Sequence, residues 1–227
     1  RRAAMAAEMD DDAMLAGATG DWNNPGSGSV AAAEAAVAAG ADACRVDGNG
    51  FTPLHCAAFN GHAELAVWLA QGPGAATVAA ADGYSGVQPL HFACESGSVA
   101  VARCLLSCDG VDVQARTNSG WTPLHYAAYG GHVEVVRLLL EEAGADIDAV
   151  NRSGETALAV ATLYGKHDVV AFLSVEWPRL LSLRTAVALW GDGRRSRRQL
   201  LSCRGGAKLR VFAQLPRGAF VEFMHQL

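Results

Sequence analysis

A stretch that begins with glycine recurs four times along the chain at almost constant spacing. It reads GFTPLHCAAFNGHAELAVWLA from Gly50, GVQPLHFACESGSVAVARCLL from Gly86, GWTPLHYAAYGGHVEVVRLLL from Gly120 and GETALAVATLYGKHDVVAFL from Gly154. The successive spacings are 36, 34 and 34 residues. Self-similarity at such a period is typical of arrays in which each unit packs mainly against its neighbours. We therefore interpret the chain as a stack of repeats.

Each unit is predicted to contain two short helices. Thr52 and Thr122 stand where an N-cap hydroxyl accepts from orphan backbone N–H groups, and the proline that follows suits the first helical position. Apolar and small residues on the first helix predict a core stripe: Leu54, Leu90, Leu124 and Leu158, with Ala57, Ala93, Ala127 and Ala161. A glycine then predicts the end of that helix, at Gly61, Gly97, Gly131 and Gly165, and a second amphipathic helix follows.

These residues resemble ankyrin repeats. The sequence T-P-L-H is intact at 52–55 and 122–125, reads Q-P-L-H at 88–91, and is reduced to T-A-L-A at 156–159. The resemblance implies an all-α solenoid built from a β-hairpin-like turn and two antiparallel helices per unit. It also implies that the histidine hydrogen-bonds at the junction between hairpin and helix. We expect that network to be incomplete where Gln88 and Ala159 replace the family residues.

A degenerate first unit is predicted upstream of Gly50. Ala16 and Gly20 are matched with Ala57 and Gly61, and the alanine-rich stretch that ends at residues 40–42 supplies a second helix. The intervening NNPGSGSV is interpreted as an extra flexible loop, because such residues favour turns and pack little. About five units result, with atypical first and last units that act as caps.

Three segments are predicted along the chain. Residues 1–10 are expected to form a disordered tail, residues 11–173 the repeat domain, and residues 174–227 a helical C-terminal cap or extension. Within the last segment, LPRGAFVEFMHQL is similar to the opening helix of an F-box, which would make the protein a substrate adaptor of a ubiquitin ligase. RRSRR is either solvated surface, a nuclear-import patch, or the context of a kinase site at Ser196 or Ser202.

Composition excludes several classes of function. A formal net charge of −5 argues against general nucleic-acid binding, which normally needs a basic surface. No uninterrupted apolar run of membrane-spanning length appears, so we expect no membrane association. The six cysteines form no disulfide or zinc pattern and are interpreted as thiols in a reducing compartment, although Cys104 and Cys108 admit a zinc interpretation. The expected compartment is the cytoplasm, with the nucleus as the alternative.

Catalysis is not predicted from the histidines or the acidic residues. His55, His91 and His125 share one repeat position, while His62 and His132 share another, so the repeat already accounts for five of the seven histidines. No acid, base or nucleophile pattern accompanies them, and GSGSV lacks the flanking residues of a phosphate loop. We expect no enzyme activity, no cofactor and no metal. The function is predicted to be recognition of another protein by a monomeric scaffold.

The predicted partner-binding surface is the concave side, formed by hairpin tips and the exposed ends of the first helices. Several of its positions hold aromatic residues, which are enriched in binding hot spots. The alternative is that some of these rings pack along the neighbouring hairpin. The candidate binding residues are Asn49, Phe51, Phe59, Asn60, Tyr84, Val87, Asn118, Trp121, Tyr129, Arg152, Glu155 and Tyr164.

Overall fold

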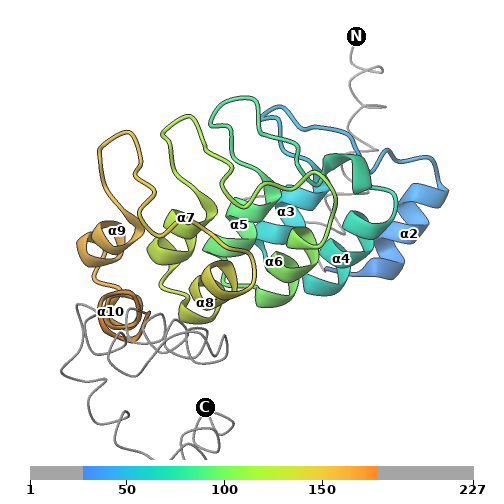
Figure 1. Ribbon diagram of the computed structural model, residues 1–227. Coiled ribbons are helices and arrows are strands. Elements are labelled where there is room, and N and C mark those ends of the chain that lie inside the picture. Colours follow the sequence, from blue (N-terminus) through green and yellow to red (C-terminus); the bar gives the residue numbers. More distant parts are fainter. Residues whose placement is uncertain (1–27, 178–227) are drawn as a thin grey trace, which may run out of the picture. The chain divides into compact units, whose positions relative to one another are not determined.

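The structure is a computed structural model that describes residues 28–177. The chain divides into two compact units, residues 1–171 and 172–227. In its described part, the first unit consists of helices without a β-strand, and one isolated antiparallel bridge joins Val150 to Thr156. The predicted all-α repeat architecture is confirmed (Figure 1).

The helices alternate between two roles within the repeats. The first helices of the units are α3 (Pro53–Phe59), α5 (Pro89–Glu95), α7 (Pro123–Gly130) and α9 (Ala157–Leu163). The second helices are α2 (Val30–Ala38), α4 (Ala63–Gln71), α6 (Val99–Leu106), α8 (Val133–Glu141) and α10 (His167–Ala171). A short 3-10 helix, η1 (Ala75–Thr77), follows α4, and a π-helical turn, η2 (Phe172–Glu176), begins the second unit.

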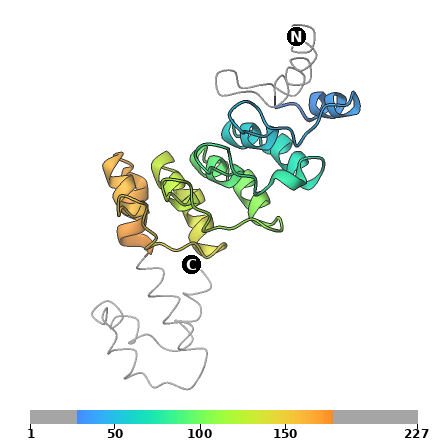
Figure 2. The same cartoon turned by 90° about the horizontal axis from the view of Figure 1, so that it is seen from above.

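Two rows of helices result from the stacking of these pairs. Helices α3, α5, α7 and α9 contact one another in that order, and α2, α4, α6, α8 and α10 do the same in the second row. Figure 2 shows the pairs side by side, while the hairpin loops extend beyond the first row in Figure 1. Each pair therefore buries its apolar faces against the adjacent pairs, as a repeat stack requires.

The predicted core stripe is buried in the inner repeats and partly exposed in the last one. Leu54, Leu90 and Leu124 are almost completely buried, and each first helix carries a fully buried alanine three residues further on. Leu158 is only half-buried. Leu158 lies on α9, which packs against α7, and no first helix of a further repeat follows α9 within residues 28–177.

The glycine at the hairpin tip of the fourth unit is required by the approach of the next hairpin. Gly120 has a φ of 78°, a conformation that L-residues with a side chain rarely adopt. A Cβ atom there would lie 2.9 Å from the backbone nitrogen of Arg152. That nitrogen donates to the carbonyl of Ser119 at 3.0 Å. Adjacent hairpins are therefore joined backbone to backbone.

The prediction for the first unit is wrong in one respect. Gly28 has a φ of 62°, and a Cβ atom on it would lie 2.6 Å from Nδ1 of His62. Gly97 stands in the same relation to His132, with a φ of 76° and a distance of 2.5 Å. Gly28 therefore occupies the position of the mid-repeat glycine. The sequence pattern assigned this position to Gly20, which lies outside the described residues. The supposed loop ends in Ser29, which caps α2 by accepting from the N–H of Ala32 at 3.3 Å.

Candidate functional site

The repeated histidine of the second, third and fourth units joins the start of its own helix to the backbone of the next hairpin. In the fourth unit, Nδ1 of His125 accepts from the backbone N–H of Thr122 at 3.2 Å and lies 2.8 Å from the Thr122 hydroxyl. Its Nε2 lies 3.0 Å from the carbonyl of Glu155 in the next hairpin. Because Nδ1 is an acceptor, the proton is assigned to Nε2, which donates to that carbonyl. The implied structural role of the histidine is confirmed for His125.

The second unit repeats this arrangement with His55. Its Nδ1 lies 2.8 Å from the Thr52 hydroxyl and accepts from the Thr52 N–H at 3.1 Å, while Nε2 reaches the carbonyl of Val87 at 3.2 Å. Burial lowers the pKa of both His55 and His125. Burial therefore favours the neutral form of both imidazoles. Each of them links the start of its own helix to the hairpin of the next repeat by hydrogen bonds.

The third unit lacks one part of the network, as expected from Gln88. His91 still accepts from the Gln88 N–H at 3.1 Å, and its Nε2 lies 3.1 Å from the carbonyl of Ala115. However, the side-chain oxygen of Gln88 is buried and has no hydrogen-bond partner among residues 28–177. A buried acceptor without a donor is unfavourable. Burial lowers the pKa of His91 to about 4.

The predicted surface aromatics form two separate clusters. In the first, Phe92 is the centre, with ring centroids 5.7 Å from Phe51 and 5.6 Å from Phe59. Phe51 and Phe59 each meet the Phe92 ring edge to face. Phe92 itself is buried, whereas Phe51 and Phe59 are half-buried. This cluster covers the hairpin before α3 and its junction with α5.

The second cluster lies on α7, its hairpin and α9. Trp121 lies 5.5 Å from Tyr126 and 5.9 Å from Tyr129, measured between ring centroids. Tyr129 in turn lies 4.7 Å from Tyr164, which is 49% exposed. We name the surface formed by Trp121, Tyr126, Tyr129 and Tyr164 the aromatic face. Tyr126 is half-buried and was not among the residues predicted from the sequence, because its partial exposure depends on how α7 packs against the neighbouring helices.

The alternative that some rings pack within the repeats applies to Trp121. Its ring packs against His125, with centroids 6.0 Å apart, and the residue is half-buried, so it supports the junction. Tyr84 is 72% exposed and is absent from both clusters. The rings do not form one continuous row.

Val87 is the clearest error among the predicted surface residues. It is 5% exposed, so the expectation that this tip position is free of core packing is wrong for Val87. The hairpin folds its backbone inward around Asp82, a buried residue that accepts from the N–H groups of Val87 and Ser85. That inward position also brings the Val87 carbonyl to His55.

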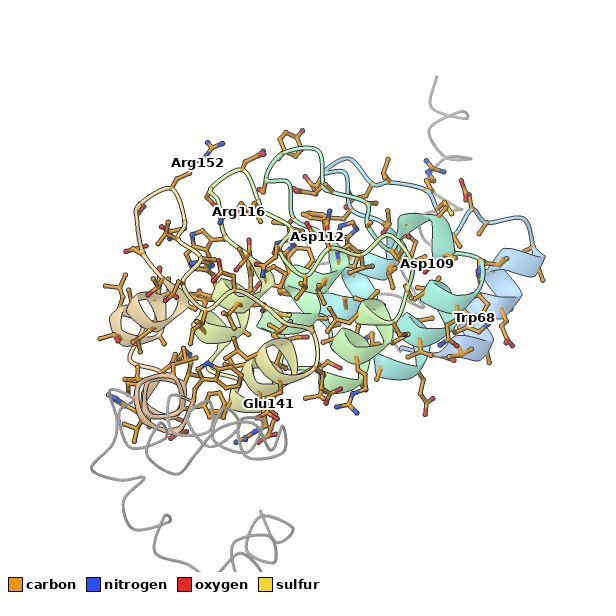
Figure 3. The ribbon with its side chains drawn as sticks, viewed as in Figure 1. Trp68, Asp109, Asp112, Arg116, Glu141 and Arg152 are labelled. Carbon is orange, nitrogen blue, oxygen red and sulfur yellow. The ribbon has the colours of Figure 1, made fainter. Side chains whose placement is uncertain are left out.

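The polar candidates divide into exposed and structural residues. Asn49 and Arg152 are exposed at hairpin tips, and Asn60 is half-buried at the end of α3. Asn118 joins two hairpins, because its side-chain amide donates to the carbonyl of Tyr84 at 2.7 Å. The carboxylate of Glu155 accepts from the Asn151 amide at 2.8 Å within one hairpin. Figure 3 shows Arg116 and Arg152 on the hairpins, whereas Trp68 and Glu141 belong to the second row of helices.

The second row carries a shallow groove of about 500 Å³. Its walls include Leu106 and Leu138, and an ion pair at 2.8 Å between Arg103 and Glu142 lies at the same place. Within the described ranges no group of three or more His, Cys, Asp or Glu side chains is placed to hold a metal ion. No described helix is both long and apolar enough to cross a bilayer. The F-box-like segment and RRSRR lie outside the described residues.

Comparison with known proteins agrees with the geometry. No curated protein matches the chain at a significant level. A family model described as ankyrin repeats (3 copies) matches residues 26–117 and 110–177. Those matches include every helix pair and histidine junction described above and cover more than half of the chain. The chain belongs to the ankyrin-repeat family.

Proposed function

We propose that this protein is a scaffold that binds a partner protein through the aromatic face. Ankyrin repeats are in general protein–protein interaction modules. The observation that carries the proposal is the pairing of Tyr129 with Tyr164, since two tyrosine rings 4.7 Å apart lie at a partly exposed surface. Tyrosine and tryptophan dominate binding hot spots.

The surroundings of the aromatic face favour binding because they are rigid. The Arg152 N–H donates to the Ser119 carbonyl, and His125 reaches the Glu155 carbonyl from the helix below. The Arg116 guanidinium also donates to the carbonyl of Val150 at 2.7 Å. A surface whose backbone is fixed before binding loses little conformational entropy when the partner arrives. The proposal describes a monomer that acts in the cytoplasm.

The test begins with identification of the partner and then removes the rings of Tyr129 and Tyr164. Affinity purification of the full chain with mass spectrometry would name candidate partners, and calorimetry would give their affinity. Tyr129→Ala combined with Tyr164→Ala should weaken binding by at least about tenfold, because both rings supply exposed apolar area. Trp121 is left in place, since it packs on His125 and its loss would also disturb the junction.

A matched control removes two exposed side chains from the second row. Glu64→Ala combined with Arg103→Ala changes α4 and α6, away from the aromatic face. This control should bind the partner with nearly unchanged affinity. If the tyrosine variant binds as tightly as the wild type, the partner docks elsewhere and the proposal is wrong.

A further inference from the structure

Glu95 is an acidic residue at the last position of α5, where the equivalent residues of α3 and α7 are Phe59 and Tyr129. Its backbone is fixed against α7, because Nε2 of His132 donates to the Glu95 carbonyl at 2.8 Å. A Cβ atom on Gly130 would lie 2.6 Å from the same carbonyl oxygen. The glycine therefore permits a close approach of the two helices, and this approach holds the Glu95 backbone against the end of α7, the helix that carries Tyr126 and Tyr129.

The carboxylate of Glu95 lacks a counter-ion in the described structure. Ion pairs in residues 28–177 involve Glu134, Glu141 and Glu142, and none of them involves Glu95. The side chain is half-buried, and burial raises its pKa. A buried or half-buried charge is unfavourable unless a cation or hydrogen bonds offset the loss of water.

Tyr126, on the neighbouring helix α7, lies within electrostatic range of this carboxylate. Burial, followed by the charges of Glu95 and Asp82, raises the pKa of Tyr126 to about 12. The ring of His91 lies 5.2 Å from that of Tyr126 but cannot act as the missing cation. Because burial lowers the pKa of His91 to about 4, this imidazole is neutral at physiological pH.

We propose that Glu95, together with Trp121, Tyr126 and Tyr129, recognises an arginine side chain of the partner protein. The aromatic rings supply faces that attract a cation, and the carboxylate supplies the opposite charge. Arginine fits better than lysine, because its planar guanidinium stacks on aromatic rings and donates two parallel hydrogen bonds to a carboxylate. This inference rests on the proposed function and specifies the chemistry of the partner.

The experiment uses short random peptides displayed on phage and selected on the full chain. Selected peptides should share an arginine, and they should lose binding to the Tyr129→Ala, Tyr164→Ala double variant. Each peptide is then resynthesised with citrulline, a neutral residue of the same shape as arginine. Citrulline should weaken binding to the wild type by about tenfold, since it removes the charge and one donor direction.

Glu95→Gln is the complementary change in the protein. It should weaken binding of the arginine peptide by about tenfold, and citrulline should then cause little further loss, because the two changes remove the same interaction. Glu64→Gln is the matched control, since it removes an equal charge from the exposed first turn of α4. The control should leave the affinity within about twofold. Circular-dichroism melts verify that both variants fold.

The outcomes separate this inference from the proposed function. If the peptides need the tyrosines but no arginine, or need lysine instead, the arginine site is wrong and the aromatic face still binds protein. Independent losses from citrulline and Glu95→Gln would also contradict the arginine site. If the selected peptides bind the tyrosine variant normally, both proposals are wrong. A selection that yields no peptide counts against the arginine site, while the binding of a natural partner decides the proposed function.

Discussion

At the scale of single residues, the histidine junction explains how each unit is joined to the next. The imidazole accepts at Nδ1 from its own helix N-terminus and donates at Nε2 to the following hairpin. The bond at Nδ1 requires the neutral ring, because a protonated Nδ1 can no longer accept. Burial lowers the pKa of all three histidines, so their contributions to the free energy of unfolding should all decrease as the pH falls.

Acid is expected to destabilise the stack through these histidines. The folded pKa of His91 is about 4, below its ordinary value of 6.5, so the unfolded chain takes up a proton first as the pH falls. The stabilisation is complete above pH 6.5 and is lost progressively down to pH 4, which amounts to roughly 3 kcal/mol for His91. Urea unfolding of the wild type across this range measures the loss.

Replacement of His91 provides the control for this pH dependence. His91→Gln should unfold more easily at neutral pH, yet its free energy of unfolding should fall less on acidification than that of the wild type. His167→Gln, at an exposed position of α10, should retain the wild-type dependence on pH. If His91→Gln shows the full wild-type loss, the buried imidazole is not its source.

At the scale of elements, burial of the first helices sets the stability of the stack. Leu124→Ala should lower the free energy of unfolding by about 2–5 kcal/mol, because Leu124 is 1% exposed and its removal leaves a cavity between adjacent helices. Glu64→Ala should change it by no more than about 0.5 kcal/mol, since that residue is exposed on α4. Equal losses in urea unfolding would show that the helix faces are misassigned.

A substitution at the N-cap of α5 should increase the stability of the protein. Gln88→Thr removes a buried oxygen without a partner and supplies a hydroxyl like that of Thr52, which accepts from the His55 N–H at the start of α3, so it should stabilise the protein by about 1 kcal/mol. The reverse change, Thr52→Gln, should destabilise it by a similar amount. Hydrogen exchange at residues 88–95 should slow in Gln88→Thr. Unchanged or faster exchange there would contradict the assigned role of the hydroxyl.

The helices could be predicted from the sequence because their signals are local. Threonine before proline marks the start of α7, and glycine marks its end, without any knowledge of the neighbouring repeats. The environment of Val87 could not be predicted in this way, because it depends on how one hairpin folds inward to meet His55 of the preceding unit. For Gly28 a signal did exist: Gly-Ser-Val at 28–30 repeats the Gly-Ser-Val at 97–99.

The candidate surface was less predictable than the helices. Tyr129 and Tyr164 could be placed at equivalent ends of first helices, but their contact depends on the spacing between α7 and α9. Glu95 could not be recognised as a binding residue from its sequence position alone. The charge of Glu95 affects the pKa of Tyr126 only because α5 and α7 pack closely beside Gly130.

At the scale of the whole molecule, the change from T-P-L-H to T-A-L-A fits the position of the last unit. Each histidine of the inner units reaches the hairpin of the following repeat. Within the described residues no hairpin of a further repeat follows α9, so a histidine at Ala159 would have no such acceptor there. The unit that has no following hairpin in the described residues is thus also the unit that lacks the histidine.

The central claim is that a partner lies on the aromatic face, and photo-crosslinking in cells tests it most directly. A benzophenone amino acid would replace Tyr129 or Tyr164 in one set of proteins, and Glu64 or Arg103 of the second row in a control set. We predict that the first set forms a covalent adduct with a partner protein after irradiation and that the control set does not. Adducts formed only from the second-row positions would contradict the account.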